Sequence, residues 1–422
     1  MIIFESNFFL VNAIVGSVFF LIYAYQFYFI PVSIFRKKIT FPDADPKRYA
    51  ILICARNEEN VIGKLIDSIH KQNYPADKID IFVLADNCTD DTAKICRNMG
   101  ARVIERENRE LVGKGYALNH LIDTITEGHT KWEYEGFFVI DADNLLDKDF
   151  VLEMNKAMSA GNPIVAGYRN TKNYADNWIS ASYGLWFIRE SRYLNHARQV
   201  LGVSSQCSGT GFVIHRDILK ELGGWHYFTL TEDVEFTFAM TAKAVKITYC
   251  PSAILYDEQP VKFTESWKQR TRWVKGYFQA YRIYCLKLLK GFIVERRFSC
   301  FDMLANTFTG AVITVGLFWF YIFSILFHII LGISLIDVLL CFVLFIACGY
   351  LAVFIIGLIT TITEWDRIYC PKARKIKYIF TFPFFLITLM VVAVFAPFSR
   401  QHWSQIEHNR TMDIDDVTAP RS

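Results

Sequence analysis

The stretch that decides the fold is "FFVIDADNLL", residues 137–146, where an apolar run leads into two aspartates separated by one alanine. Side chains of a β-strand alternate between its two faces, so Asp141 and Asp143 would point the same way if the extended conformation continued. Two carboxylates held that close repel each other unless a cation lies between them. The sequence thus predicts a metal site at a strand end, and the alternative is a strand that simply ends in a polar turn.

Strands alternate with helices around this stretch. Apolar runs predict strands at residues 49–55, 79–85, 101–105 and 136–140. The segments between them predict helices at residues 60–72, 90–99 and 113–125. Strands linked in this way form a mostly parallel sheet with right-handed crossovers, and ligands bind beyond the carboxyl ends of its strands. The sequence therefore predicts an α/β domain whose site lies at that edge of the sheet.

Carboxylates stand at three of these strand ends. The first strand is followed by "ARNEE", the second by "DNCTDD" and the fourth by "DADN". Because unpaired clustered negative charge costs stability, we expect these side chains to face a shared crevice with a functional role. No G-x-G-x-x-G motif follows the first strand, which argues against a nicotinamide or flavin enzyme.

Two further segments lie in the second half of the chain. In "TLTEDVEF", residues 229–236, Thr229 and Glu232 fit a capping box that opens a helix. Residues 264–288 predict one helix whose apolar stripe and flanking basic residues are typical of a helix on an anionic membrane face. On this helix Gln269, Arg272 and Trp273 have the spacing of a shared second face. The tryptophan either serves a ligand or packs against the catalytic domain.

The two ends of the chain are more apolar than its middle. Hydrophobic residues make up 53% of the 422 residues. Four stretches contain no Asp, Glu, Lys or Arg: residues 6–35, 303–331, 338–363 and 378–399. Because a transmembrane helix needs about 20 apolar residues, each stretch predicts one span. For the last stretch, Pro383 and Pro397 leave a re-entrant or interfacial hairpin as the alternative.

Basic residues indicate the orientation of these spans. They lie at residues 36–38, 296–297 and 367–377, next to the ends of the spans. By the positive-inside rule these clusters face the cytoplasm. The sequence therefore predicts a multi-pass protein of the cell (plasma) membrane with a cytoplasmic catalytic domain.

Charge and cysteine content exclude other classes of protein. The net charge is only +3, so no nucleic acid partner is expected. The ten cysteines are scattered without a CxxC pair, which predicts reduced thiols and no zinc site.

Taken together, these segments resemble the membrane-embedded family-2 glycosyltransferases, the inverting synthases of cellulose, chitin, hyaluronan and poly-N-acetylglucosamine. The matching segments, in the order of the family, are Asp86 in "LADN", Lys114 in "GKGYALN", "DAD" at 141–143, "GTG" at 209–211, "TED" at 231–233 and "QRTRW" at 269–273. The resemblance covers residues 48–300 and implies an α/β domain of the GT-A type, a Rossmann-like mixed sheet, plus transmembrane helices.

The resemblance also implies a domain plan. Its parts are an N-terminal transmembrane helix at 1–36, a cytosolic GT-A domain at 48–263, an amphipathic interface helix region at 264–300, C-terminal transmembrane helices at 301–399 and a tail at 400–422.

Roles for individual residues follow from the same resemblance. It implies Asp233 as the general base, and Asp143 with Asp141 as ligands of Mg²⁺ or Mn²⁺. The implied contacts to the donor nucleotide and diphosphate are Arg56, Glu58, Asp86, Lys114, Asp141, Gln269, Arg270 and Arg272. The implied acceptor contacts are Trp273, Thr210 and Glu232.

The resemblance favours one function over two others. We expect a membrane-bound inverting enzyme that transfers a sugar from a UDP-sugar to a growing β-linked polysaccharide. Four spans enclose little space for a polymer unless the protein has an accessory subunit or forms a homo-oligomer. The alternatives are transfer of a single sugar to a lipid or lipid-linked acceptor, and a nucleotide-binding membrane scaffold or transporter. The spans lack the charged residues that mark transport pathways.

Overall fold

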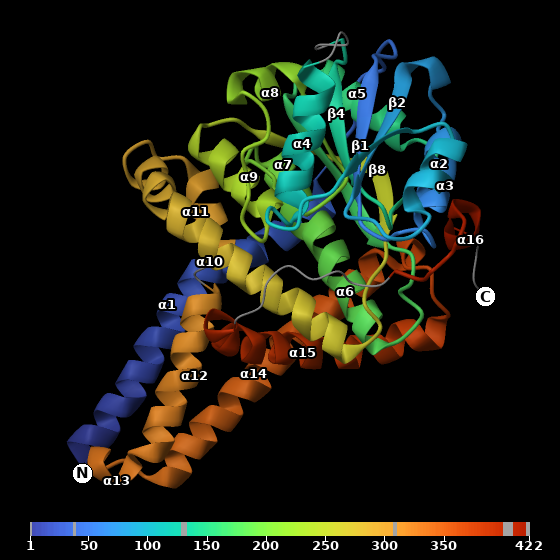
Figure 1. Ribbon diagram of the computed structural model, residues 1–422. Coiled ribbons are helices and arrows are strands. Elements are labelled where there is room, and N and C mark those ends of the chain that lie inside the picture. The colour runs from blue at the N-terminus through green and yellow to red at the C-terminus, as the bar shows by residue number, and fades with distance from the viewer. Residues whose placement is uncertain (1, 37–38, 128–132, 307–309, 400–407, 419–422) are drawn as a thin grey trace.

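The structure is a computed structural model that describes residues 2–36, 39–127, 133–306, 310–399 and 408–418 (Figure 1). Its strands form one sheet in the order β3-β2-β1-β4-β7-β6-β8-β5. The first four are β1 (Tyr49–Ala55), β2 (Ile79–Asp86), β3 (Arg102–Arg106) and β4 (Gly136–Asp141). They are parallel to one another, and their ends agree with the predicted ends to within one residue.

The other half of the sheet is mixed, which confirms the Rossmann-like mixed sheet that the resemblance implies and adds antiparallel strands to the expectation of a mostly parallel sheet. Its strands are β5 (Leu145–Leu146), β6 (Ile164–Thr171), β7 (Phe212–His215) and β8 (Ile247–Asp257). Strand β7 runs antiparallel to both β4 and β6, and β5 runs antiparallel to β8. The expectation rested on the N-terminal strands alone, and those strands are parallel.

Helices cover both faces of the sheet. One face packs against α2 (Ile62–His70), α3 (Thr92–Asn98) and α5 (Phe150–Ser159), and the other against α4 (Lys114–Glu127), α8 (Arg216–Leu222) and α9 (Glu232–Ala242). In β4, Phe138 belongs to the first core and Phe137 to the second. Because both faces of the sheet are covered, β4 is apolar until Asp141, which lies at the carboxyl end of the strand.

The remaining helices lie outside these two layers. Between β6 and β7 the chain forms α6 (Trp178–Arg189), a π-helical turn (Glu190–Asn195) and α7 (His196–Val200). The terminal and C-terminal helices are α1 (Ile2–Phe35), α10 (Phe263–Ile293), α11 (Phe298–Leu304), α12 (Gly310–Leu326), α13 (His328–Leu331), α14 (Leu335–Thr363), α15 (Lys372–Phe395) and α16 (Ile414–Thr418). Single 3-10 turns lie at Ala76–Lys78, Trp365–Arg367 and Ala396–Phe398.

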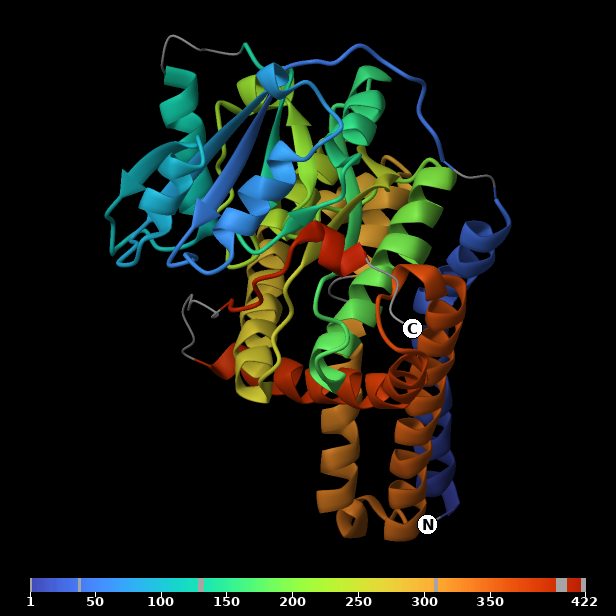
Figure 2. The same ribbon diagram turned by 90° about the vertical axis from the view of Figure 1, so that its right-hand side faces the viewer.

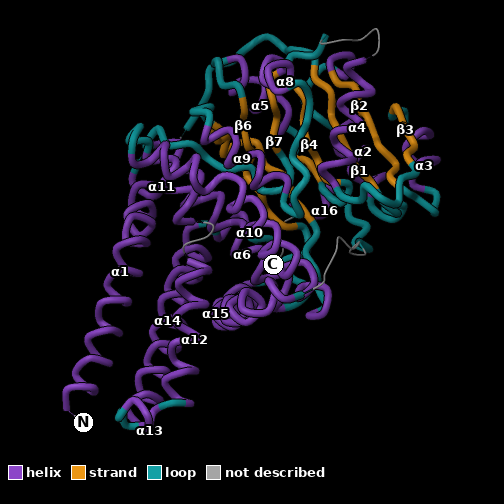
Figure 3. The backbone as a smooth tube through the Cα atoms, turned by 60° about the vertical axis from the view of Figure 1, so that its left-hand side comes forward, coloured by secondary structure: helices purple, strands orange, loops and turns teal. Residues whose placement is uncertain are grey.

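In the described part of the chain, three helices are long and apolar enough to cross a membrane. They are Ala13–Phe35, Leu335–Thr363 and Lys372–Phe395, and the apolar helix Val315–Leu326 is shorter. Helices α1, α12 and α14 extend away from the sheet together (Figure 3), whereas α15 runs across them beside the domain (Figure 2). Both the span and the interfacial hairpin predicted for residues 378–399 stay open, because α15 is long and apolar enough to span but runs across the other apolar helices (Figure 2).

Helix α10 confirms the single helix predicted for residues 264–288, but its apolar stripe is covered by protein. Val274 packs against Val392 of α15, and Leu288 packs against Met303 of α11. These parts of the stripe therefore lie against neighbouring helices, where the sequence predicted a membrane face.

The predicted capping box at the start of α9 does not form. Thr231 precedes the helix without a side-chain capping bond, and Oγ1 of Thr229 donates to the carbonyl of Thr231 at 3.1 Å. Glu235 accepts the backbone N–H groups of Phe228 and Thr229 instead, each at 2.9 Å. Because Glu235 takes over this local role, the Glu232 carboxylate does not cap the helix.

Candidate active site

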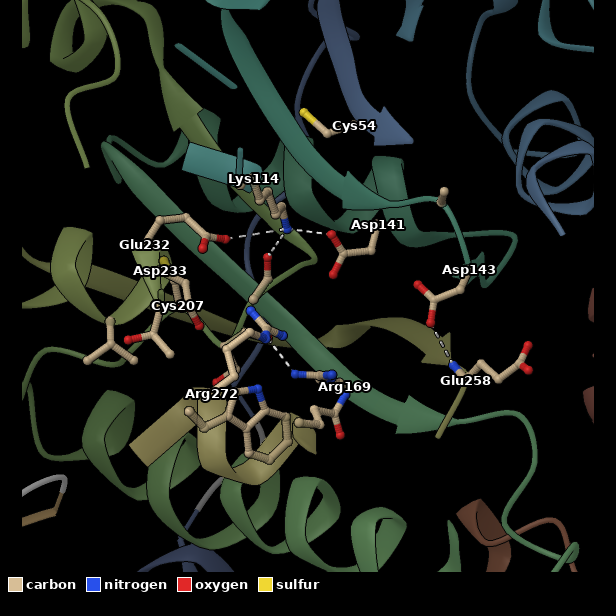
Figure 4. A pocket seen from close by; sticks show the side chains of 18 of the residues that line it. Cys54, Lys114, Asp141, Asp143, Arg169, Cys207, Glu232, Asp233, Glu258 and Arg272 are labelled. Carbon is tan, nitrogen blue, oxygen red and sulfur yellow. Dashed lines mark hydrogen bonds and ion pairs between the residues drawn. The ribbon is translucent and has the colours of Figure 1, made fainter. Parts of the chain in front are cut away.

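One pocket beyond the carboxyl ends of β1, β2 and β4 collects all but two of the predicted site residues (Figure 4). The predicted residues that line it are Arg56, Glu58, Asp86, Lys114, Asp141, Asp143, Glu232, Asp233, Gln269, Arg272 and Trp273. Figure 4 shows Asp143 on one side, Glu232 and Asp233 on the other, and Lys114 with Asp141 between them. The shared crevice predicted from the strand ends is therefore present.

Asp86 marks one end of this pocket, where an arginine that the sequence did not reveal holds its carboxylate. Asp86 ends β2 and is 6% exposed. Nη1 of Arg106 donates to its Oδ1 at 2.6 Å, and Nδ2 of Asn87 donates to the same oxygen at 3.1 Å. Arg106 lies directly opposite Asp86 in the β2–β3 pairing. Pairing of neighbouring strands thus fixes the orientation of this carboxylate.

The C-terminal segment also enters the pocket. Nδ1 of His408 lies 3.0 Å from a carboxylate oxygen of Glu58, and Nε2 lies 3.9 Å from Oδ2 of Asp143. Burial lowers the pKa of His408, but the carboxylates of Asp143 and Glu58 outweigh this effect and raise the pKa to about 10. The segment is anchored outside the pocket by Arg410, whose Nη2 lies 2.6 Å from Asp176. The predicted tail is therefore docked on the domain where it is described.

Strand β4 ends at Asp141, so the alternation of side chains along a strand does not determine where the Asp143 side chain points. A turn follows, in which the N–H of Asn144 donates to the carbonyl of Asp141 at 3.1 Å. Oγ1 of Thr210 accepts the N–H of Asp141 at 2.9 Å and donates to Oδ1 of Asn144. The strand therefore ends in a polar turn, and Asp141 and Asp143 also line one pocket. Thr210 is buried and supports this turn, which corrects its prediction as an acceptor contact.

The two glycines around Thr210 are required by backbone geometry. Gly209 and Gly211 have φ values of +80° and +70°, which favour glycine. A Cβ atom on Gly211 would also lie 1.8 Å from the side chain of Leu255. The glycines let this segment pass close to the sheet, and the carbonyl of Gly209 faces Lys114.

Lys114 supplies a buried cation at the centre of the pocket. Its Nζ donates to the carboxylate of Asp141 and, at 2.6 Å, to the carbonyl of Gly209, and it lies 3.9 Å from Glu232. Burial disfavours the charged ammonium, but Asp141 and Glu232 outweigh this and raise the pKa of Lys114. The ammonium therefore stays charged and can stabilise negative charge on a leaving group.

The carboxylates of Asp141 and Asp143 fit a hard divalent cation. Oδ1 of Asp143 accepts Nδ2 of Asn144, and Oδ2 accepts the N–H of Glu258, each at 3.2 Å, so each oxygen keeps a lone pair for a ligand. Among the described residues, no group of three His, Cys, Asp or Glu side chains is placed to hold a metal. The site fits a metal such as Mg²⁺ that takes its remaining ligands from phosphate and water.

Asp233 and Glu232 form the wall opposite Asp143. Burial raises the pKa of both carboxyl groups, and the cations Lys114 and Arg272 oppose the shift. A buried carboxylate with a raised pKa is a better proton acceptor than an ordinary aspartate. This wall can therefore remove a proton from a bound hydroxyl group.

The face of α10 that carries Gln269, Arg272 and Trp273 forms the floor of the pocket at the end where Glu232 and Asp233 lie. Gln269, Arg272 and Trp273 line the pocket together, as their spacing predicts. Trp273 also packs edge-on against Tyr183 and Phe187 of α6, with ring centroids 5.7 and 6.0 Å apart. The packing interpretation of this tryptophan is confirmed, and because its ring also lines the pocket, its role toward a ligand stays a prediction.

Arg270 does not contact the pocket, which corrects its prediction as a diphosphate contact. Its side chain is buried against α15, where Nη1 donates to the carbonyl of Phe385 at 3.1 Å and to Oγ1 of Thr388 at 2.7 Å. Nε donates to the carbonyl of Ser266, one turn earlier on α10. Burial lowers the pKa of Arg270. This arginine therefore joins α10 to α15.

A further pair, Arg169 and Asp257, was missed by sequence reasoning. Nε of Arg169 donates to Oδ2 of Asp257 at 2.5 Å, and Nη1 donates to the carbonyl of Ser208 at 2.7 Å. The guanidinium lies 3.6 Å from the ring centroid of Phe187. Arg169 lines the pocket, but it stands within a strand whose pairing with β8 the sequence does not show.

Comparisons with known proteins agree with the geometry. Residues 46–276, more than half of the chain, match the family described as "Glycosyltransferase like family 2". The chain is 28% identical over 295 residues to "Probable glycosyltransferase YdaM" of Bacillus subtilis, a match that covers 65% of this chain and 67% of that protein.

Two named synthases are also similar. The "Beta-monoglucosyldiacylglycerol synthase" of Nostoc sp. is 27% identical over 60% of this chain and 54% of its own length. The "Poly-beta-1,6-N-acetyl-D-glucosamine synthase" of Staphylococcus epidermidis is 25% identical over 64% of this chain and 65% of its own length. In each case the match spans between half and two thirds of the relative.

Among solved structures, the fold is similar to that of "Mannosyltransferase PcManGT from Pyrobaculum calidifontis in complex with GDP-Man and Mn2+". The TM-score is 0.57 at 14% identity, with 94% of this chain and all of the other chain covered. This similarity shows the fold, a GT-A-like α/β domain with attached apolar helices.

Proposed function

Since the chain belongs to glycosyltransferase family 2, we propose that it is a membrane-bound inverting enzyme that transfers a sugar from a UDP-sugar to a hydroxyl group of a lipid or lipid-linked acceptor. One observation carries the proposal. Asp143 and Asp233 stand on opposite sides of one pocket, with the Lys114 ammonium between them (Figure 4). This arrangement separates a site for the leaving diphosphate from a site for the attacking hydroxyl group.

The donor would lie along the pocket from Asp86 to Lys114. Asp86 and Glu58 offer acceptors for the polar groups of a nucleoside, and Arg56 lines the same end. A Mg²⁺ or Mn²⁺ ion held by Asp141 and Asp143 would neutralise charge on the leaving diphosphate. The chain adds fixed positive charge from Lys114, and from the planar guanidinium of Arg272 further along the pocket.

Asp233 would act as the general base in the transfer. The acceptor hydroxyl attacks the anomeric carbon from the side opposite the leaving diphosphate, and Asp233 takes its proton as the new bond forms. Attack from the opposite side inverts the anomeric configuration, so an α-linked donor gives a β-linked product. Glu232 lies beside Asp233 and close to Lys114, which suits it to hold the acceptor rather than to replace the base.

We also propose that the protein is a multi-pass protein of the plasma membrane with its catalytic domain in the cytoplasm. The apolar side chains of α14 support membrane insertion, since Leu344 is 52% exposed on that helix. Arg36 and the basic residues at 296–297 and 367–377 lie at the domain end of the apolar helices (Figure 1), as the positive-inside rule requires for this orientation.

The packing beneath Trp273 favours single transfer over polymer extrusion. Trp273 lies in a cluster with Tyr183 and Phe187 of α6 and with Phe385 of α15, so packed side chains fill the space between the pocket floor and α15. A membrane-bound acceptor can reach the pocket from its edge without crossing this layer. Polysaccharide synthesis is the second candidate, because a flat indole suits successive chain ends.

The experiment is a screen of UDP-sugars with the purified protein in detergent, with UDP release and product mass as readouts. We expect one UDP-sugar to be consumed in the presence of Mg²⁺ or Mn²⁺, and one sugar to be added to a lipid acceptor. A ladder of product lengths would favour the second candidate. Absence of UDP release from every UDP-sugar would contradict both and revive the nucleotide-binding scaffold or transporter.

A further inference from the structure

A buried glutamate that neither the motifs nor the chemistry above uses lies at the acceptor end of the pocket. Glu190 is 8% exposed and lines the same pocket as Asp233, Trp273 and Tyr277. It begins the π-helical turn that interrupts the helical run from α6 to α7. Such turns often occur at functional sites, because the extra residue redirects a side chain. Here the redirected side chain is a carboxylate.

Two residues of the segment that leads into β7, "SSQCSGTGF" at 204–212, hold this carboxylate. Nε2 of Gln206 donates to Oε1 of Glu190 at 2.8 Å, and Oγ of Ser208 donates to the same oxygen. Among the described residues no hydrogen bond is made to Oε2. The nearby guanidinium of Arg169 gives its hydrogen bonds to Asp257 and the carbonyl of Ser208. One carboxylate oxygen is thus fixed, while the other is left for a ligand.

A chain of amide side chains supports Gln206 from behind. Nδ2 of Asn306 donates to Oε1 of Gln206 at 3.1 Å, and Nε2 of Gln26 in α1 lies 3.4 Å from Oδ1 of Asn306. Oε1 of Gln26 in turn accepts Nη2 of Arg189 at 3.1 Å. The position of Glu190 therefore depends on residues of α1 and of the segment after α11, which join the domain to the apolar helices.

The surroundings of Glu190 suit a sugar ring. Trp186 and Phe187, which precede it on α6, line the pocket, and so do Trp273 and Tyr277 of α10. Aromatic rings cover the apolar faces of a sugar, whereas a fixed carboxylate accepts a hydrogen bond from one of its hydroxyl groups. A lipid with a single hydroxyl group would use that group for the attack and leave Glu190 unsatisfied.

We propose that Glu190 is a specificity-determining residue for the acceptor. Its Oε2 accepts a hydrogen bond from a second hydroxyl group of the acceptor, next to the hydroxyl that attacks the donor. The acceptor is therefore a sugar, either the head of a lipid or the end of a glycan, and not a lipid alcohol with one hydroxyl group. Gln206, Asn306 and Gln26 are positioning residues. The inference rests on the proposed transfer from a UDP-sugar.

The test uses octyl β-D-glucoside as the acceptor, its monodeoxy analogues, and dioleoylglycerol, with the UDP-sugar that the wild-type protein consumes. The wild type should use the glucoside, and one monodeoxy analogue should be about 10- to 100-fold poorer in kcat/KM, the range for a hydrogen bond to a charged group. Glu190→Ala should raise the acceptor KM by a similar factor and use that analogue as well as the parent. Release of UDP without acceptor should not change.

Further variants keep the test decisive if Glu190→Ala does not fold. Glu190→Gln preserves the volume of the side chain and should weaken the same discrimination. Gln26→Ala should raise the acceptor KM without changing UDP release in the absence of acceptor. Gln199→Ala is the matched control, because the side-chain Oε1 of Gln199 accepts the N–H of Tyr249 at 3.3 Å and Gln199 lies outside the pocket lining. It should leave both constants unchanged.

The outcomes separate this inference from the proposed function. A single added sugar on the glucoside identifies a lipid head as the acceptor, and a ladder identifies a glycan end, and both agree with the role of Glu190. Equal use of dioleoylglycerol, unchanged discrimination in the Glu190 variants, or a raised KM for the UDP-sugar would overturn it. If the wild type releases no UDP from any UDP-sugar, the proposed function itself fails.

Discussion

Replacing Asp233 by asparagine should slow the chemical step with little effect on donor binding. The side chain keeps its shape but loses the ability to take a proton. Removal of a general base costs about 10²- to 10⁴-fold in kcat, equivalent to roughly 3–5 kcal/mol in the activation barrier. The neighbouring Glu232 should not take over as the base, because its carboxylate lies 3.9 Å from the Lys114 ammonium and forms an ion pair with it.

The assay measures kcat from UDP release and donor affinity from calorimetry with UDP and Mn²⁺. Glu235→Gln is the matched control, since Glu235 is on the same turn of α9 but accepts backbone N–H groups of Phe228 and Thr229. We expect this control to lower the thermal unfolding temperature and to keep kcat within a few-fold of the wild type. If Asp233→Asn lowered only the unfolding temperature while kcat persisted, the role of Asp233 as a base would be refuted.

The other predictions concern metal, pH, helix packing and the acceptor. Asp143→Asn should abolish turnover and Mn²⁺-dependent UDP binding, and full activity in excess chelator would contradict a metal requirement. Because burial raises the pKa of Asp233 above the ordinary 3.8, kcat should fall on acidification at a higher pH than for an exposed aspartate, as a pH–rate profile would show. Arg270→Ala should cost about 2–3 kcal/mol in unfolding free energy by removing the charged hydrogen bonds that join α10 to α15, with donor KM unchanged; a raised donor KM would restore its role at the diphosphate. Trp273→Ala should raise acceptor KM about 10-fold and leave donor hydrolysis intact, and the reverse pattern would place the indole on the donor.

The strand ends and the pocket were predictable because local chemistry determines them. Strand β4 is buried on both faces, so its apolar run is unbroken until Asp141. A polar residue at such a point must lie at the edge of the sheet, and parallel strands bring their ends together. For this reason Asp86, Asp141 and the segment after β1 could be placed in one crevice without a structure.

The motifs do not show that Arg270 and Thr210 lie outside the pocket lining, because this depends on where each side chain points in the folded chain. One residue turns an α-helix by about 100°, so Arg270 points well away from Gln269 and from Arg272. The family motif nevertheless includes this arginine. Thr210 sits between two glycines with positive φ, and its inward direction depends on the turn after β4.

The contribution of the C-terminal segment had no local signal. His408 lies 350 positions from Glu58 in the sequence, and its placement depends on the anchoring of Ile414 and Val417 in a cluster with Tyr256. A histidine in a polar segment does not predict a partner so far along the chain. The same holds for Arg106, which meets Asp86 through the pairing of two strands.

The most direct test of the account is the anomeric configuration of the product, measured by proton NMR after turnover of an α-linked UDP-sugar with octyl β-D-glucoside in the presence of Mg²⁺ or Mn²⁺. We expect a β-linked sugar formed in equal amount with UDP, because Asp233 activates the acceptor on the side opposite the diphosphate. An α-linked product would contradict direct attack by the acceptor, and so would UDP release without any transferred sugar.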